Sequence, residues 1–141
     1  MTTPEASTRS VIVEKDFPHP PEKVWRALTE TNLIEQWLMK NDFAPETGHA
    51  FKLRMDPVPG WDGVIDCKVL TVDPYKSLSY TWGTLGMGSV VTFTLTPTAS
   101  GTHVHVEQAG FRADQEQAFK GATYGWRGFI GKLEDVVAGL A

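Results

Sequence analysis

The sequence predicts an α+β domain in which one antiparallel sheet packs against a long C-terminal helix. Apolar residues recur at helical spacing over residues 21–40, at every second position from about residue 51 to residue 107, and at helical spacing again over 114–139. Consecutive strands with short turns indicate an antiparallel meander with one buried face. The C-terminal segment is the apolar helix that is long enough to cover that face.

One domain accounts for the whole length. A chain of 141 residues buries roughly 68% of the surface that its unfolded state exposes, and it is too short for two domains. The apolar fraction of 41% and the charged fraction of 21% are typical of a globular protein. We assign the domain to residues 10–141 and interpret residues 1–9 as a flexible N-terminal tail.

Charge and cysteine content exclude several classes of partner. The net charge of -4 gives no clustered basic surface for nucleic acid or for an anionic membrane. The single cysteine, Cys67, has no partner for an internal disulfide. The N-terminus lacks a signal-peptide pattern, and no apolar run approaches the ~20 residues that span a bilayer. We therefore expect a cytoplasmic protein that binds neither nucleic acid nor membrane.

The N-terminal quarter contains one strand and two short helices. A β-branched run over residues 10–17 predicts the first strand, which ends at Pro18. The following prolines suit the first turn of a helix over residues 21–29. A second helix has Thr31 as its predicted N-cap and ends around Lys40.

Five further strands complete a predicted six-stranded curved sheet. In each of them apolar residues alternate with polar ones, which places the apolar side chains on the inner face. These inward residues are Phe51, Leu53, Met55, Ile65, Cys67, Val69, Leu78, Tyr80, Trp82, Val91, Phe93, Leu95, Val104 and Val106. We expect them to face Trp37 from the short helices and Trp126 and Phe129 from the long helix. The long helix over residues 114–139 has Asp114 as its predicted N-cap.

Several motifs in this order resemble a known family. They are the stretch from Phe17 to Thr29 with its Val24-Trp25, then Gln36-Trp37-Leu38, Val72-Asp73-Pro74-Tyr75-Lys76 with Leu78, Tyr80 and Trp82, and Tyr124-Gly125-Trp126. The chain resembles the START-related helix-grip superfamily (SRPBCC), and within it the bacterial homologues of the activator of the heat-shock protein 90 ATPase. The resemblance implies a sheet wrapped around the C-terminal helix with a cavity between them.

The resemblance does not imply one reaction. The superfamily contains ligand carriers, hormone receptors, cyclases, hydroxylase components and co-chaperone domains, so function depends on the site. The eukaryotic co-chaperone has a further N-terminal domain for which 141 residues leave no room. A role as activator of a chaperone is therefore the weaker expectation.

The inner face is rich in aromatic side chains and methionine. We predict that an apolar ligand contacts Trp37, Phe51, Met55, Cys67, Tyr80, Trp82, Phe93 and Trp126. The alternative is that these side chains only fill the core. Tyr80 and Trp82 each bring a hydrogen-bonding group into apolar surroundings, where it needs a partner or orients a ligand.

Residues with catalytic or metal-binding potential form no recognisable constellation. His103 and His105 share one strand face with Glu107, which is interpreted as an exposed face because the sequence places no third ligand there. Cys67 is expected to be a buried, inert thiol. No nucleophile elbow, phosphate loop or paired metal motif is present in the sequence. We predict no catalytic residue, no metal and no cofactor.

Four glycines in the C-terminal helix require a separate explanation. Gly121, Gly125, Gly128 and Gly131 each cost about 1 kcal/mol relative to alanine inside a helix. The first three lie on one side, where they would permit close approach of a strand, a ligand or a second copy of the chain in a homodimer.

The function predicted from these observations is non-catalytic binding of a hydrophobic or aromatic small molecule between the sheet and the long helix. Two alternatives remain open. One is a chaperone-linked module that acts through a surface patch. The other is an enzyme that uses Tyr80 or a histidine at the cavity mouth as acid or base.

Overall fold

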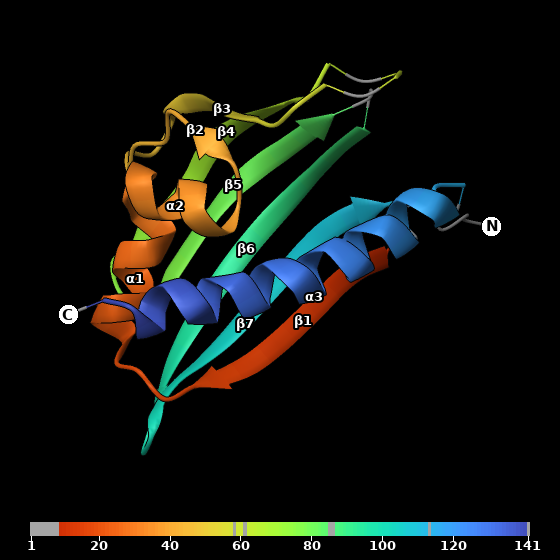
Figure 1. The fold of residues 1–141 in the computed structure, drawn as a ribbon. Coiled ribbons are helices and arrows are strands. Elements are labelled where there is room, and N and C mark those ends of the chain that lie inside the picture. Colours follow the sequence, from red (N-terminus) through yellow and green to blue (C-terminus); the bar gives the residue numbers. More distant parts are fainter. Residues whose placement is uncertain (1–8, 58, 61, 85–86, 113, 141) are drawn as a thin grey trace.

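Seven antiparallel strands form one curved sheet in the part of the chain that the structure describes, and the helices lie against one of its faces (Figure 1). The computed structural model describes residues 9–57, 59–60, 62–84, 87–112 and 114–140, without the side chains of residues 84 and 87. The elements are β1 (Arg9–Phe17), α1 (Pro21–Thr29), α2 (Thr31–Trp37), β2 (Lys40–Asn41), β3 (Ala50–Arg54), β4 (Val64–Asp73), β5 (Ser77–Thr84), β6 (Met87–Thr98), β7 (Gly101–Phe111) and α3 (Glu116–Ala138). The predicted α+β helix-grip architecture is confirmed.

The strand order is β1-β7-β6-β5-β4-β3-β2, so the meander from β3 to β7 is flanked by β2 on one edge and β1 on the other. The predicted count of six strands was short by one. Lys40 and Asn41 pair with Arg54 and Leu53, and a strand of two residues is too short to produce an alternating pattern. The same pairing ends α2 at Trp37 rather than near Lys40.

Helix α3 lies across the concave face, beside β7 and β1 (Figure 1). Its buried residues are Trp126, Ile130, Leu133 and Val137, which recur at the spacing of one helical face. Helices α1 and α2 lie near its C-terminal half, as Figure 1 shows. None of the described helices combines the length and apolarity needed to cross a membrane.

Both predicted N-caps were wrong. Helix α2 begins at Thr31 itself, with Glu30 in the cap position. Helix α3 begins at Glu116 after Gln115, whose side-chain oxygen accepts the Arg112 backbone N–H at 2.7 Å. Asp114 is paired with the Arg112 guanidinium at 3.2 Å, so its carboxylate is engaged outside the helix.

The N-terminal residues 1–8 of the predicted tail lie outside the described residues, whereas Arg9 belongs to β1. Its guanidinium is 2.6 Å from a carboxylate oxygen of Glu116 and lies 4.0 Å from the centroid of the Phe119 ring. These contacts attach the start of β1 to the first turns of α3.

A bulge bends the sheet beside the candidate site. The β4–β5 register shifts between Val69 and Thr71, where Val69 lies opposite Tyr80 and Thr71 opposite Ser79. An extra residue of this kind increases local twist and redirects the neighbouring side chains.

Candidate ligand-binding site

Aromatic rings from the sheet and the helices meet between β5, β6, α2 and α3. Phe93 is central to this aromatic cluster, because its ring centroid lies 6.1 Å from that of Trp37, 5.9 Å from that of Tyr80 and 5.8 Å from that of Trp126. The cluster extends from Tyr80 to Phe51 at 5.1 Å. In the other direction, Trp126 leads to Trp82 at 5.5 Å. Seven of the eight predicted ligand-contacting side chains are buried together here, namely Trp37, Phe51, Cys67, Tyr80, Trp82, Phe93 and Trp126.

Met55 was predicted wrongly as an inward residue, since 48% of it is exposed. Strand β3 ends at Arg54, which pairs with Val64. The Met55 N–H then bonds to the carbonyl oxygen of Gly63 at 2.9 Å. Gly63 has a φ of 82°, and a Cβ there would lie 2.2 Å from the Met55 carbonyl oxygen. Because the backbones of Met55 and Gly63 approach so closely, the inward–outward alternation of β3 ends at Arg54, one residue before Met55.

The sequence analysis missed Phe43 as a member of the aromatic cluster, and it placed Phe129 against the inner face. Phe43 is buried, and its ring centroid lies 5.1 Å from that of Phe51. It follows β2 as a single aromatic residue in a loop, without a periodic pattern around it. Phe129 is partly buried against the core, with its ring 5.5 Å from that of Trp126.

A buried polar chain holds the tryptophan end of the cluster. The Trp126 Nε1–H donates to Gln108 Oε1 at 2.7 Å, and Gln108 Nε2 donates to Ser89 Oγ at 2.9 Å. The Ser89 hydroxyl in turn donates to the carbonyl oxygen of Trp82 at 3.1 Å. Gln108 continues the inward alternation of Val104 and Val106, so its position followed from the pattern although the sequence analysis did not name it.

The other polar groups of the cluster differ in whether they have a hydrogen-bond partner. The Trp37 Nε1–H donates to the carbonyl oxygen of Ala27 at 2.8 Å. Tyr80 is 4% exposed and Trp82 is 8% exposed. Within the described residues, neither the Tyr80 hydroxyl nor the Trp82 indole N–H makes a hydrogen bond.

Burial keeps the ionisable groups of the cluster protonated. Desolvation raises the pKa of Tyr80 well above its usual value, and the nearby Cys67 adds to the effect. Desolvation, followed by the carboxylates of Asp66 and Asp42, raises the pKa of the Cys67 thiol to about 12. The predicted inert thiol agrees with this environment, because a thiolate is the nucleophilic form.

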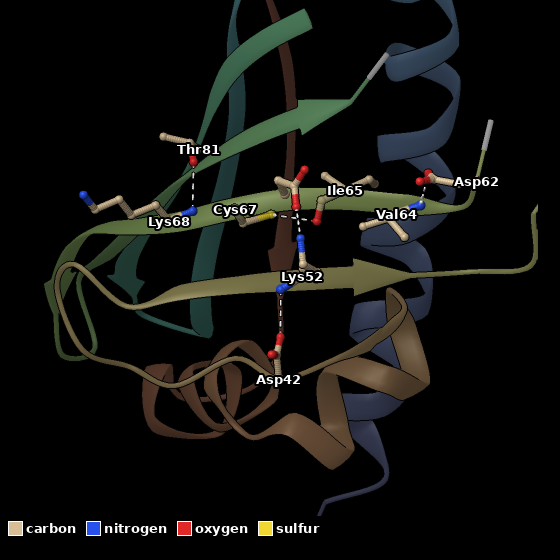
Figure 2. A network of polar contacts seen from close by, with 9 residues as sticks. Asp42, Lys52, Asp62, Val64, Ile65, Cys67, Lys68 and Thr81 are labelled. Atoms are coloured by element: carbon tan, nitrogen blue, oxygen red, sulfur yellow. Dashed lines mark hydrogen bonds and ion pairs between the residues drawn. The ribbon is translucent and has the colours of Figure 1, made fainter. Parts of the chain in front are cut away.

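Side-chain oxygens accept hydrogen bonds from backbone N–H groups and hold the strands around Cys67 together (Figure 2). An Asp42 carboxylate oxygen accepts the Lys52 N–H of β3 at 2.7 Å, and Lys52 Nζ is paired with Asp66 on β4. The Thr81 hydroxyl accepts the Lys68 N–H at 2.8 Å. These contacts tie the loop after β2 to β3, β4 and β5 on the polar side of the strands.

A surface groove of about 630 Å³ lies along α3, lined by Tyr124, Gly125, Arg127, Gly128, Phe129 and Lys132. Phe129 belongs both to this groove and to the aromatic cluster. Lys132 also lines a second depression of about 420 Å³ between α2 and α3, together with Gln36, Asp135 and Val136. Phe129 is thus the groove residue whose ring packs on Trp126 of the aromatic cluster.

The helix glycines do not permit close approach of a strand. A Cβ at Gly121, Gly128 or Gly131 would meet nothing within 4 Å, and one at Gly125 would meet only the Phe129 ring. Of the three explanations in the sequence analysis, a strand is therefore wrong. A ligand or a second copy of the chain at this surface stays a prediction.

His103 and His105 lie on the opposite face of the sheet, whereas the His49 ring stacks on Phe51 with their centroids 6.4 Å apart. His103 Nδ1 is 2.7 Å from Asp16 Oδ1, and its Nε2 is 2.8 Å from Glu14 Oε1. These hydrogen bonds, that to Asp16 first, raise the pKa of His103. Both ring nitrogens are occupied by β1 carboxylates, and the described residues contain no group of three or more His, Cys, Asp or Glu side chains arranged to hold a metal.

Fold and interior together define a helix-grip protein with an aromatic cluster beneath its C-terminal helix. The family model described as "Activator of Hsp90 ATPase homolog 1-like protein" matches residues 18–138. The chain belongs to this family. No protein with curated function matches the sequence.

Solved structures agree with this assignment. The crystal structure of protein MLL2253 from Mesorhizobium loti is 54% identical, with a TM-score of 0.87 over 92% of this chain and 97% of that one. The solution structure of protein BH1534 from Bacillus halodurans is 28% identical, with a TM-score of 0.79 over 92% and 96% of the two chains. DynU16, from the dynemicin biosynthetic locus, is 25% identical with a TM-score of 0.80, and the match covers 92% of this chain and 47% of DynU16.

Proposed function

We propose that this protein binds a hydrophobic or aromatic small molecule between the sheet and α3 without converting it. The observation that carries the proposal is the continuity from the 630 Å³ groove through Phe129 to the aromatic cluster around Phe93. Aromatic walls with few polar groups are the usual lining of small-molecule sites.

The state of the ionisable groups supports binding over catalysis. Cys67 and Tyr80 are both held protonated by burial, so neither is available as a nucleophile or base near neutral pH. His103 is engaged by Asp16 and Glu14 on the other face of the sheet. An enzyme acting within the cluster would have to use protonated Tyr80 as an acid or the His49 ring, which stacks on Phe51.

Intrinsic tryptophan fluorescence tests the proposal, because Trp37, Trp82 and Trp126 lie in or beside the cluster. We expect compounds in a screen of lipids and aromatic metabolites to change the fluorescence and raise the melting temperature. The substitution Phe129→Ala should raise the dissociation constant about tenfold or more, because it removes one aromatic contact surface.

The matched control is Ile12→Ala, since Ile12 is an exposed apolar residue on β1, 52% accessible. It should bind as the wild type does. A screen in which no compound moves either fluorescence or melting temperature would contradict the proposal.

A second candidate is a chaperone-linked role, which only the name of the matching family favours. The test is the ATPase rate of purified Hsp90 with and without this protein. An increase that saturates with protein concentration supports the role, and an unchanged rate counts against it.

A further inference from the structure

We propose that the bound molecule is neutral and carries an oxygen, such as a ketone carbonyl, that accepts a hydrogen bond from the Tyr80 hydroxyl or the Trp82 indole N–H. This inference rests on the proposed function and names the chemical class of its ligand. It starts from two buried donors on the inner face of β5 that the described residues leave without an acceptor.

The protein satisfies equivalent donors elsewhere in the same cluster. The indole N–H groups of Trp37 and Trp126 bond to Ala27 and Gln108 at 2.8 and 2.7 Å. A buried polar group without a partner destabilises the folded state, which is why such groups are rare. Tyr80 and Trp82 carry this cost in the free protein, and an acceptor on the ligand would remove it.

The two donors are placed to act on one molecule. Tyr80 and Trp82 are two residues apart on β5, so their side chains share one face with Cα atoms roughly 6.6 Å apart. Tyr80 is surrounded by the rings of Phe43, Phe51 and Phe93. Those rings offer no competing acceptor of comparable strength, so a carbonyl oxygen would be the preferred partner of the hydroxyl.

The surroundings exclude an anionic head group at this point. The buried polar residues in the described part of the chain are Ser79, Ser89, Thr102 and Gln108, and none of them is cationic. A carboxylate beside Tyr80 would be desolvated without a counter-ion, at a cost that neutral oxygens avoid. Because the pKa of Tyr80 is raised, its hydroxyl remains a donor across the physiological range.

Three probes of similar shape separate these possibilities: benzophenone, diphenylmethane and diphenylacetate. The ketone and the hydrocarbon differ at one carbon, and diphenylacetate adds a carboxylate. In fluorescence titrations of the wild type, we expect benzophenone to bind about tenfold more tightly than diphenylmethane, and diphenylacetate to bind more weakly than either.

Variants assign the donor. Tyr80→Phe or Trp82→Phe should abolish the preference for benzophenone over diphenylmethane. The ratio of the two affinities is the readout, because each substitution also changes a contact surface that both probes share. Tyr75→Phe is the matched control, because it removes a hydroxyl from a tyrosine that is 49% exposed on the turn between β4 and β5. That variant should retain the full preference.

The outcomes separate this inference from the proposed function. Equal affinities for benzophenone and diphenylmethane, tightest binding of diphenylacetate, or a preference that survives both substitutions on β5 overturns the inference and leaves ligand binding intact. Failure of benzophenone to bind also overturns it. Failure of the whole compound screen overturns the proposed function as well.

Discussion

Trp126 and Tyr80 lie in one aromatic cluster, and both contact Phe93. The Trp126 indole N–H has a hydrogen-bond acceptor, whereas the Tyr80 hydroxyl has none within the described residues. At the Trp126 end, Gln108 and Ser89 complete a chain of hydrogen bonds across α3, β7 and β6. At the Tyr80 end, the described residues supply no acceptor. The first end is built for stability, and the second retains a polar group that a ligand can use.

The largest effect is expected from removing the ring that both ends share. Phe93 is 1% exposed and contacts Trp37, Tyr80 and Trp126. Phe93→Ala should lower the free energy of unfolding by about 3–5 kcal/mol, through lost transfer energy and the cavity left behind. Urea denaturation measures this loss. Tyr124→Ala, at a residue 84% exposed, should stay within about 0.5 kcal/mol of the wild type.

Removing the hydrogen bond at the Trp126 end should lower the stability less. Gln108→Leu removes the acceptor of the Trp126 N–H at nearly constant volume, so we expect a loss of about 1–3 kcal/mol in the free energy of unfolding. Gln117→Leu, on the exposed side of α3, is the control. Equal stability of the two variants would show that the polar chain is not a structural requirement.

Removing a polar group at the Tyr80 end should change the free energy of unfolding in the opposite direction. Tyr80→Phe removes a buried hydroxyl without a partner. The free energy of unfolding of the ligand-free variant should therefore equal that of the wild type or exceed it by up to about 1 kcal/mol. Urea denaturation of protein stripped of bound compounds measures the change. A loss of 1 kcal/mol or more would mean that the hydroxyl is already satisfied, and the contrast between the two ends would disappear.

The smallest effect is expected at His103, which lies on the outer face of β7, the strand that also carries Gln108. Because the folded pKa of His103 is raised, its contribution to stability is complete below the unfolded pKa of about 6.5 and is lost as the pH rises through the folded pKa. The contribution should stay below about 1 kcal/mol, since the His103 side chain is 35% exposed.

His103→Gln tests this expectation. The melting temperature of the variant should fall furthest below that of the wild type near pH 5.5 and should converge with it at alkaline pH. A difference that does not change with pH would assign the role of His103 to packing rather than to its charge.

Much of the fold followed from the sequence because long, regular elements determine it. The alternation in β3 to β7 and the helical spacing in α2 and α3 predicted the sheet, its inner face and the burial of seven of the eight residues named as ligand contacts. The errors fell where an element ends. Met55 leaves β3 because of the crossing at Gly63, and Asp114 pairs with Arg112 instead of capping α3. Such ends depend on contacts that local patterns do not record.

The site was harder to predict than the fold. Phe43 entered the cluster from a loop without periodicity, and Gln108 was overlooked although it continued a regular alternation. The sequence did identify Tyr80 and Trp82 as polar groups in apolar surroundings. It could not show that Trp37 and Trp126 find acceptors while Tyr80 and Trp82 do not, because that distinction depends on which backbone and side-chain oxygens lie within bonding distance.

The pairing of β1 with β7 has a consequence for how the chain folds during synthesis. Asp16 and His103, neighbours in this pair, are 87 residues apart in the sequence. Strand β1 leaves the ribosome first and has no native partner until most of the protein has been made. Contacts of such long range slow folding, and a β-branched strand with open edges is prone to pair with other chains in the meantime.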